Sequence, residues 1–309
     1  MPCVQPHRMR VRTWADSGSR HQVLIASRAA SHSLLGRGAL NATADREVSM
    51  RANRVLLIWV ATGLVAFAEV QTELVEYRHG DAVLEGVLAW DDANAEKRPG
   101  VLVVPAWKGV DDHSRDWAAK LAAEGYVALV ADIYGKGVRP ATADEARAES
   151  GKYRNDRALM RARAAAGLEC LSKNERVDAE RLAVIGFCFG GTVALELARS
   201  GAELDATVSI HGGLGTPNPN DAKAIHGRVL ALHGAADPHV PPAEVEAFEK
   251  EMKDAGVDWK LTPYEGAVHA FTDPSAGSDP SRGAAYHEEA AGKAWADMTA
   301  FLHEVLSGK

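Results

Sequence analysis

Three residues of types that catalyse acyl transfer follow one another in the second half of this 309-residue chain: Cys188, Asp237 and His269. Cys188 is at the centre of the hexapeptide Gly-Phe-Cys-Phe-Gly-Gly at residues 186–191. In a nucleophile elbow, glycines beside a central nucleophile allow a turn tight enough to aim that side chain out of a sheet. The pattern predicts Cys188 as the nucleophile, His269 as its general base and Asp237 as the carboxylate that orients the histidine.

Two other interpretations of these residues stay open at this point. A free cysteine is usually a small buried apolar residue; we expect this for Cys170 on a helix interior, whereas three glycines in the hexapeptide argue against it for Cys188. His233 and His239 flank Asp237 and would suit a metal, but they lack the ligand spacing typical of zinc sites. We therefore expect no metal and no cofactor.

A nucleophile of this kind needs a rigid sheet behind it, and the chain contains continuous apolar runs typical of strands buried on both faces. We predict such strands at residues 101–104, 127–130, 182–185, 207–210 and 229–232, and a last one at 259–264. Two alternating segments, 72–79 and 82–90, flank Gly80-Asp81 and predict a hairpin. Helical segments are predicted at residues 115–124, 143–150, 156–171, 191–200, 242–255 and 283–306.

Strands that alternate with helices predict an α/β fold with a mostly parallel central sheet and helices on both faces. The chain order nucleophile, acid, base is that of the α/β-hydrolase fold. Turn-rich segments at residues 217–220 and 273–281 are too short to be domain linkers. Residues 69–309 are therefore predicted to form a single α/β-hydrolase domain.

Composition excludes several classes of protein. Hydrophobic residues make up 46% of the chain and charged residues 25%, which is typical of a globular protein with a sizeable core. Only three cysteines are present, too few for a disulfide scaffold. The formal net charge of -7 argues against a nucleic-acid partner, because binding phosphates requires a basic face.

The first 68 residues differ in character from the rest. Residues 1–49 hold seven arginines, no lysine and no apolar period, so we expect a disordered or wrongly assigned extension. From Met50, two arginines, an apolar run and the tripeptide Ala-Phe-Ala at 66–68 match a secretory signal peptide at residues 50–68. We expect a periplasmic or secreted protein without stable membrane association after cleavage. The alternatives are an uncleaved anchor or, if the signal is unused, a cytoplasmic protein.

The hexapeptide around Cys188, the segment Asp-Ile-Tyr-Gly at residues 132–135 after a strand, and the spacing to Asp237 and His269 together resemble the dienelactone hydrolase family. This family is the cysteine-dependent branch of the α/β-hydrolases, and the resemblance covers roughly residues 75–306. It implies hydrolysis of lactones or activated esters through an acyl-thioester. It also implies an oxyanion hole made by the backbone N–H groups of Phe189 and Trp107.

Two positions depart from the family's pattern. The loop at residues 104–109 contains no glutamate to control the nucleophile, and Ala106 occupies the matching place. Asp273, four residues after His269, stands where the family has a carboxylate-binding arginine. Because both groups act on dienelactone itself, we expect the substrate to be a neutral or differently charged ester or lactone.

Five side chains are candidates for substrate contact: Lys108, Tyr134, Arg154, Arg157 and His211. The basic ones have a plainer interpretation, since a loop lysine is usually solvated and arginines at helical spacing usually form ion pairs on a solvated face. Packing at a strand end is the corresponding alternative for the histidine.

Three functions are compatible with these observations. The first is an exported hydrolase whose partner is a small-molecule ester or lactone. The second is a thiol-redox protein, which needs a reactive cysteine but would normally also have a resolving partner. The third is a catalytically silent α/β-hydrolase that serves as a binding module, which the missing glutamate favours and the complete set of three catalytic residue types opposes.

Overall fold

The computed structural model describes residues 69–93 and 96–307. The predictions for the extension at 1–49 and for the signal peptide at 50–68 lie outside these residues. Within the described ranges, no helix is long and apolar enough to cross a membrane.

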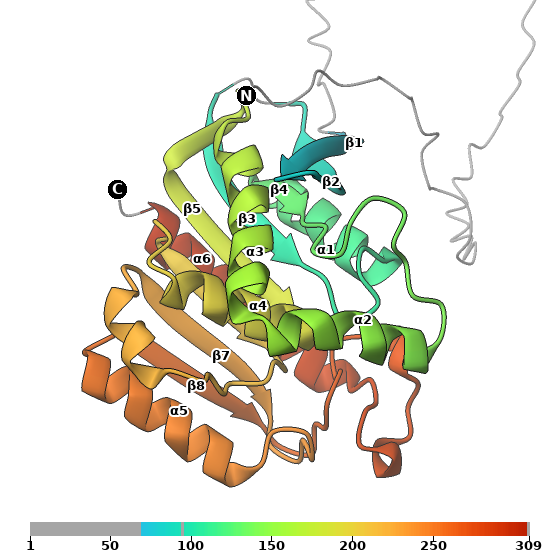
Figure 1. The fold of residues 1–309 in the computed structure, drawn as a ribbon, viewed down its shortest axis with the longest axis vertical. Coiled ribbons are helices and arrows are strands. Elements are labelled where there is room, and N and C mark those ends of the chain that lie inside the picture. Colours follow the sequence, from blue (N-terminus) through green and yellow to red (C-terminus); the bar gives the residue numbers. More distant parts are fainter. Residues whose placement is uncertain (1–68, 94–95, 308–309) are drawn as a thin grey trace, which may run out of the picture. The chain divides into compact units, whose positions relative to one another are not determined.

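An eight-stranded sheet runs through the molecule in the order β1-β2-β4-β3-β5-β6-β7-β8 (Figure 1). The strands are β1 Val70–His79, β2 Ala82–Asp91, β3 Arg98–Val104, β4 Val127–Val130, β5 Val177–Phe187, β6 Ala206–Ile210, β7 Arg228–Gly234 and β8 Trp259–Tyr264. The first two strands form an antiparallel hairpin, β2 pairs antiparallel with β4, and all later pairings are parallel. The predicted hairpin, the buried strands and the mostly parallel sheet are confirmed.

Helices cover both faces of the sheet, as predicted. They are α1 Asp112–Ala123, α2 Ala143–Asn155, α3 Arg157–Ser172, α4 Phe189–Arg199, α5 Pro242–Ala255 and α6 Glu288–Ser307. Helices α1 and α6 pack on one face with a core of valine, alanine, leucine and tryptophan side chains. Helices α3 and α4 pack on the other face, and α5 continues this layer over β7.

Three predicted helix boundaries were wrong by three residues or more: α2 continues to Asn155, five residues past its predicted end, and α1 and α6 begin elsewhere than predicted. Helix α1 begins three residues earlier than predicted, because Asp111 and Ser114 form a reciprocal capping box. Helix α6 begins five residues later than predicted, at Glu288. The residues before it form a 3₁₀ turn, Pro280–Arg282, which ends at Gly283 in the left-handed conformation. The chain from there runs beside the loop that carries His269.

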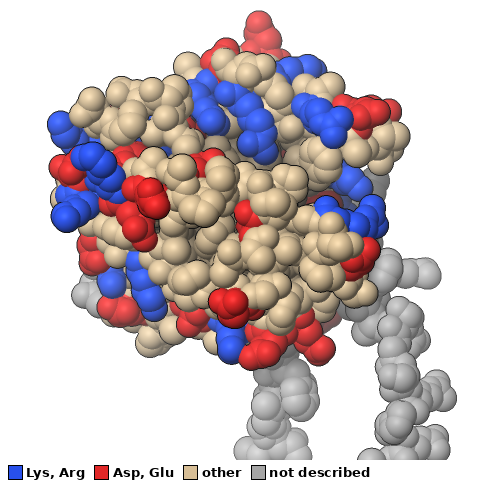
Figure 2. Space-filling model, turned by 90° about the horizontal axis from the view of Figure 1, so that it is seen from below, with Lys and Arg blue, Asp and Glu red and all other residues tan. Residues whose placement is uncertain are grey.

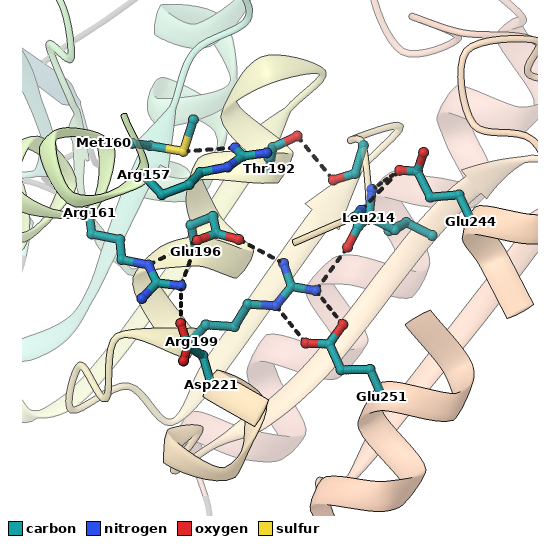
Figure 3. Close-up of polar contacts among 12 residues, drawn as sticks. Arg157, Met160, Arg161, Thr192, Glu196, Arg199, Leu214, Asp221, Glu244 and Glu251 are labelled. Atoms are coloured by element: carbon teal, nitrogen blue, oxygen red, sulfur yellow. Dashed lines mark hydrogen bonds and ion pairs between the residues drawn. The ribbon is translucent and has the colours of Figure 1, made fainter. Parts of the chain in front are cut away.

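Buried charges fix helix α4 to its neighbours (Figure 3). Arg199, fully buried on α4, makes a two-pronged ion pair with Glu251 of α5 at 2.7 and 2.8 Å and contacts Glu196 at 3.3 Å. Its guanidinium also donates to the carbonyl of Leu214, at 2.8 Å. Arg161 of α3 pairs with Glu196 at 2.7 Å. These bonds tie the helix after the nucleophile to two other helices and to the loop that follows β6.

Candidate active site

The nucleophile elbow has the geometry that its glycines predict. Cys188 lies between the end of β5 and the first residue of α4, with φ +52° and ψ −114°. A Cβ at Gly186 would lie 2.0 Å from the carbonyl oxygen of Gly190, and a Cβ at Gly190 would lie 2.2 Å from the last carbonyl of β3. No side chain fits at either position, which explains why the turn requires glycine on both sides.

Asp237 and His269 reach the elbow from loops that follow β7 and β8. The Nδ1 atom of His269 lies 2.8 Å from Oδ2 of Asp237, whose carboxylate is buried. The other carboxylate oxygen accepts the backbone N–H of His239, at 2.8 Å. A carboxylate on Nδ1 holds the imidazole with its remaining nitrogen, Nε2, free to face a nucleophile.

The thiol of Cys188 and the His269 ring share a hydrogen bond. Burial opposes ionisation of the thiol, but this bond, the charges of His269 and Arg154, and the N–H of Phe189 outweigh it and lower the pKa of Cys188. Burial also opposes protonation of the ring, yet its bonds to Asp237 and Cys188 raise the pKa of His269 to about 10. Opposite shifts of the two groups favour a thiolate–imidazolium pair at neutral pH.

The predicted oxyanion groups lie on two segments that touch each other. The N–H of Phe189 begins helix α4 and points to the sulfur. Trp107 lies in the loop after β3, and that loop packs against Gly190 of the elbow. The hydroxyl of Tyr134 donates to the carbonyl of Trp107, at 2.8 Å, and so holds the loop from below.

A cavity of about 710 Å³ opens over the thiol, and it is lined by residues from all these loops. The charged residues of its lining are Lys108, Asp111, Arg154, Asp273 and Arg282. Four imidazoles also line it, those of His113, His211, His239 and His269. Figure 2 shows the molecule from the side to which the parallel strands point, where blue and red side chains both surround a largely tan centre. The cavity therefore offers charged groups of both signs, four imidazoles and apolar side chains.

Lys108, Arg154 and His211, three of the five predicted substrate contacts, line this cavity. The guanidinium of Arg154 lies over the Phe189 ring, 5.3 Å from its centroid. His211 is almost fully buried, and its ring packs against that of His269 at 5.4 Å between centroids, with an angle of 64° between the ring planes.

The structure corrects the two other contacts. The ring of Tyr134 is buried against Tyr153 and Phe189, and its hydroxyl donates to the carbonyl of Trp107. Tyr134 therefore supports the loop after β3 and is not part of the cavity lining. Arg157 is not part of the cavity lining, and its guanidinium contacts the sulfur of Met160 at 3.4 Å (Figure 3). Sequence spacing places a residue on a helix but does not decide the direction of a long side chain.

Several residues of the site carry no signal in the sequence. His113 comes from the first turn of α1, and Arg282 from the 3₁₀ turn before α6, more than 160 residues apart in the chain. Neither lies in a motif. The alternative of a zinc site at Asp237, His233 and His239 finds no support in the geometry: over residues 69–93 and 96–307, no group of three or more candidate ligands comes together to hold a metal.

Left-handed backbone at non-glycine residues is confined, within the described part of the chain, to three residues of this site. They are Cys188 with φ +52°, His211 with φ +41° and Ala270 with φ +56°. Cys188 and His211 directly follow the strands β5 and β6, and Ala270 directly follows His269. All three residues line the cavity.

Comparison with known proteins agrees with this architecture. A solved structure described as a dienelactone hydrolase-like promiscuous phosphotriesterase from metagenomic libraries is 39% identical and superposes with a TM-score of 0.74, over 76% of this chain and 98% of that one. A putative dienelactone hydrolase from Klebsiella pneumoniae is 26% identical, with a TM-score of 0.65, over 76% of this chain and 98% of that chain.

Among curated proteins, a probable 2-oxo-3-(5-oxofuran-2-ylidene)propanoate lactonase from a Bradyrhizobium species is 29% identical over 220 residues, 68% of this chain and 86% of that protein. A putative carboxymethylenebutenolidase from Salmonella typhimurium is 32% identical over 212 residues, 65% of this chain and 75% of that protein. The dienelactone hydrolase family itself matches residues 84–306, from β2 to the end of α6. The chain is therefore a hydrolase with the α/β-hydrolase fold and belongs to the dienelactone hydrolase family.

Proposed function

We propose that this protein hydrolyses lactones or activated esters, with Cys188 as nucleophile, His269 as general acid and base, and Asp237 as the orienting carboxylate. One observation carries the proposal: the His269 imidazole bonds both the buried Asp237 carboxylate and the Cys188 thiol, the thiol pKa is lowered, and Cys188 and His269 line a cavity. A nucleophile next to a base that a third group orients is the arrangement required for covalent catalysis.

Acylation begins with attack of the Cys188 thiolate on the substrate carbonyl carbon. A C–S bond forms, and the carbonyl electrons move to oxygen, where the N–H groups of Phe189 and Trp107 stabilise the negative charge. When the tetrahedral intermediate collapses, the C–O bond to the leaving oxygen breaks and His269 gives that oxygen its proton. In a lactone the leaving oxygen stays attached to the same molecule, so the ring opens.

Deacylation returns the enzyme to its starting state. His269, now neutral, takes a proton from water as the water oxygen attacks the thioester carbon, and the C–S bond breaks to release the acid and the thiolate. A thiolate is itself a good leaving group, so the first intermediate reverts unless the substrate oxygen leaves more easily. This condition favours enol lactones, activated esters and thioesters over amides.

The assignment of the nucleophile is tested by turnover of activated esters and lactones. We expect Cys188→Ala to lose turnover by several orders of magnitude, as happens when a triad residue is removed. Alkylation of the wild type by iodoacetamide should abolish activity, and mass spectrometry should find the label on Cys188. Full activity in Cys188→Ala would overturn the proposal. Cys188→Ser should keep part of the activity, because the same geometry suits an alkoxide.

The same assay separates the two alternative functions. A silent binding module shows no turnover in the wild type. A thiol-redox protein shows reversible oxidation of Cys188 without ester turnover, and it needs a resolving thiol; Cys170, on α3, is buried. Following the oxidation state of Cys188 in parallel with ester hydrolysis therefore distinguishes all three.

We propose that the natural substrate is a neutral or differently charged ester or lactone and not dienelactone. Ala106 and Asp273 line the cavity where the family resemblance implies a glutamate and an arginine, and the cationic residues of the lining are accompanied by Asp111 and Asp273. The test compares kcat/KM for dienelactone with that for an uncharged aryl ester of similar size. A preference for dienelactone of more than about a hundredfold, or roughly 2.7 kcal/mol of transition-state binding, would refute this substrate assignment.

We also propose that the enzyme acts outside the cytoplasm after cleavage following Ala68, on the strength of the signal-like sequence alone. Expression from Met50 followed by N-terminal sequencing of the exported material should give Glu69 as the first residue. Retention of that protein in the cytoplasm, or exported protein that still carries residues 1–49, would contradict this.

A further inference from the structure

His211, directly after β6, bonds to both catalytic segments at once. Its Nδ1 accepts the backbone N–H of Cys188 at 3.2 Å, an N–H that also reaches the carbonyl of Ile210 at 3.0 Å. Its Nε2 lies 2.8 Å from the hydroxyl oxygen of Thr272. The ring is 2% exposed, so water does not compete for either nitrogen.

These bonds fix the protonation of the ring. An N–H always donates, so Nδ1 must carry a lone pair, and the proton of a neutral imidazole must then be on Nε2. Nε2 consequently donates to Thr272. Burial, together with the nearby charge of His269 and His113, lowers the pKa of His211 well below its usual value and keeps the ring neutral. His211 is therefore a fixed connector and not a second general base.

Thr272 belongs to the loop that carries the base, three residues after His269. It is 3% exposed, and its backbone is held separately: its carbonyl accepts Nε2–H of His113 at 3.1 Å. Through its hydroxyl, the Thr272 side chain thus connects the base loop to His211 and, through His211, to the nucleophile turn. Removing the hydroxyl alone would leave the backbone tie in place.

We propose that the His211–Thr272 hydrogen bond is a positioning device that holds the imidazole of His269 at hydrogen-bonding distance from the thiol of Cys188. This inference rests on the proposed function, because it assigns a role within that reaction. His211 and Thr272 touch neither the scissile bond nor the leaving group in this role. They set the distance between the two groups that do, and a small displacement of such groups is costly to catalysis.

Two single substitutions break the bond from opposite ends. Thr272→Val keeps the shape of the side chain and the carbonyl used by His113 but removes the hydroxyl. In His211→Asn the side chain is too short to bond Thr272, while asparagine tolerates the left-handed backbone at this position. Thr272→Ser restores a hydroxyl. Exposed Thr72→Val and His303→Asn serve as matched controls away from the cavity.

We expect Thr272→Val and His211→Asn each to lower kcat by about 10- to 100-fold with KM changed less than about twofold, the pattern of misplaced catalytic groups. Iodoacetamide inactivation should need a higher pH in both, because a loosened His269 stabilises the thiolate less. Thr272→Ser should behave as wild type. The double variant should be no worse than either single one, since both remove the same interaction.

A merely structural role gives a different result. It would lower the melting temperature and the fraction of titratable thiol, but kcat per active site and the pH profile of alkylation would stay unchanged, and this outcome overturns the inference. Additive losses in the double variant overturn it as well. If one variant fails to fold, the other still tests the bond from its opposite end.

Failure of this inference is distinguishable from failure of the proposed function. Full turnover in Cys188→Ala refutes the proposed function, whereas the alkylation profile of Cys188 in the two variants reports on the link regardless of turnover. If Cys188→Ala is inactive while Thr272→Val and His211→Asn match the wild type, the function stands and only the positioning role is refuted.

Discussion

Arg154 lies at the edge of the cavity, near the thiol, and its positive charge helps to lower the pKa of Cys188. Replacing it by glutamine removes this charge, so the pKa of the thiol rises and less thiolate is present at a given pH. We predict that Arg154→Gln slows alkylation by iodoacetamide at pH 6–7 by about two- to fivefold, a modest effect because the guanidinium is exposed and screened.

The measurement is the pH dependence of the inactivation rate at low and high salt. The midpoint should move to higher pH in Arg154→Gln, and added salt should reduce its difference from wild type. Arg147→Gln, on the same helix but paired with Asp144 in solvent, is the matched control. An unchanged midpoint in Arg154→Gln would remove this residue from the electrostatics of the nucleophile.

Asp237 accepts Nδ1–H of His269, the proposed general base, and thereby selects the tautomer of that imidazole. In Asp237→Asn the side-chain amide favours the other tautomer, with Nε2 protonated and unable to accept a proton. We predict that kcat falls by about 10²- to 10⁴-fold while KM changes little, in line with the loss known for an orienting aspartate in a catalytic triad.

Steady-state kinetics check this prediction, and chelation tests its alternative. Treatment with EDTA should leave the wild type unaffected. Loss of activity in EDTA with recovery on addition of zinc would instead indicate a metal site built around Asp237, His233 and His239.

At the scale of elements, α4 holds its place partly through a buried charge. Arg199→Met leaves the carboxylates of Glu251 and Glu196 without their buried partner. Because an uncompensated buried charge is costly, we predict a loss of about 3–5 kcal/mol in the free energy of unfolding, measured by urea denaturation.

A second change tests whether the cost is electrostatic. Combining Arg199→Met with Glu251→Leu removes the stranded carboxylate and should recover most of the stability, because apolar replacement of a buried pair is often neutral. Lys250→Met, which breaks an exposed pair with Asp254 on α5, should cause little change. A loss in the double variant as large as in Arg199→Met would show that packing and not charge is responsible.

The strands and their mostly parallel pairing were predictable because buried parallel strands are continuous apolar runs, and this pattern is local in the chain. The start of α6 was not, because it depends on a 3₁₀ turn that precedes it and on the bridge between His269 and Ala284. Contacts of this kind join segments that are distant in sequence. They leave no periodic signal.

That Cys188, Asp237 and His269 lie close together was predictable from the sequence, because each follows a strand and the carboxyl ends of parallel strands share one edge of the sheet. The surroundings of these residues were less accessible to prediction. Whether Tyr134 faces substrate or supports a loop depends on one hydrogen bond at its hydroxyl, and Arg282 enters the cavity from the far end of the chain. Side-chain direction and long-range contact are properties of the folded molecule.

At the scale of the whole molecule, the left-handed residues of the site imply a trade-off: their backbone conformation lowers folding stability but holds the proposed catalytic side chains in place. A non-glycine residue in this conformation costs about 1–2 kcal/mol, and a glycine relieves it at an entropic cost of about 0.5–1 kcal/mol. Ala270→Gly should therefore leave stability unchanged or raise the melting temperature by a few degrees, and it should lower kcat because the neighbouring His269 gains freedom. Calorimetry and kinetics on the same variant check both effects. Selection for thermostability alone would then favour glycine at position 270. The resulting enzyme would have a higher melting temperature and a lower kcat.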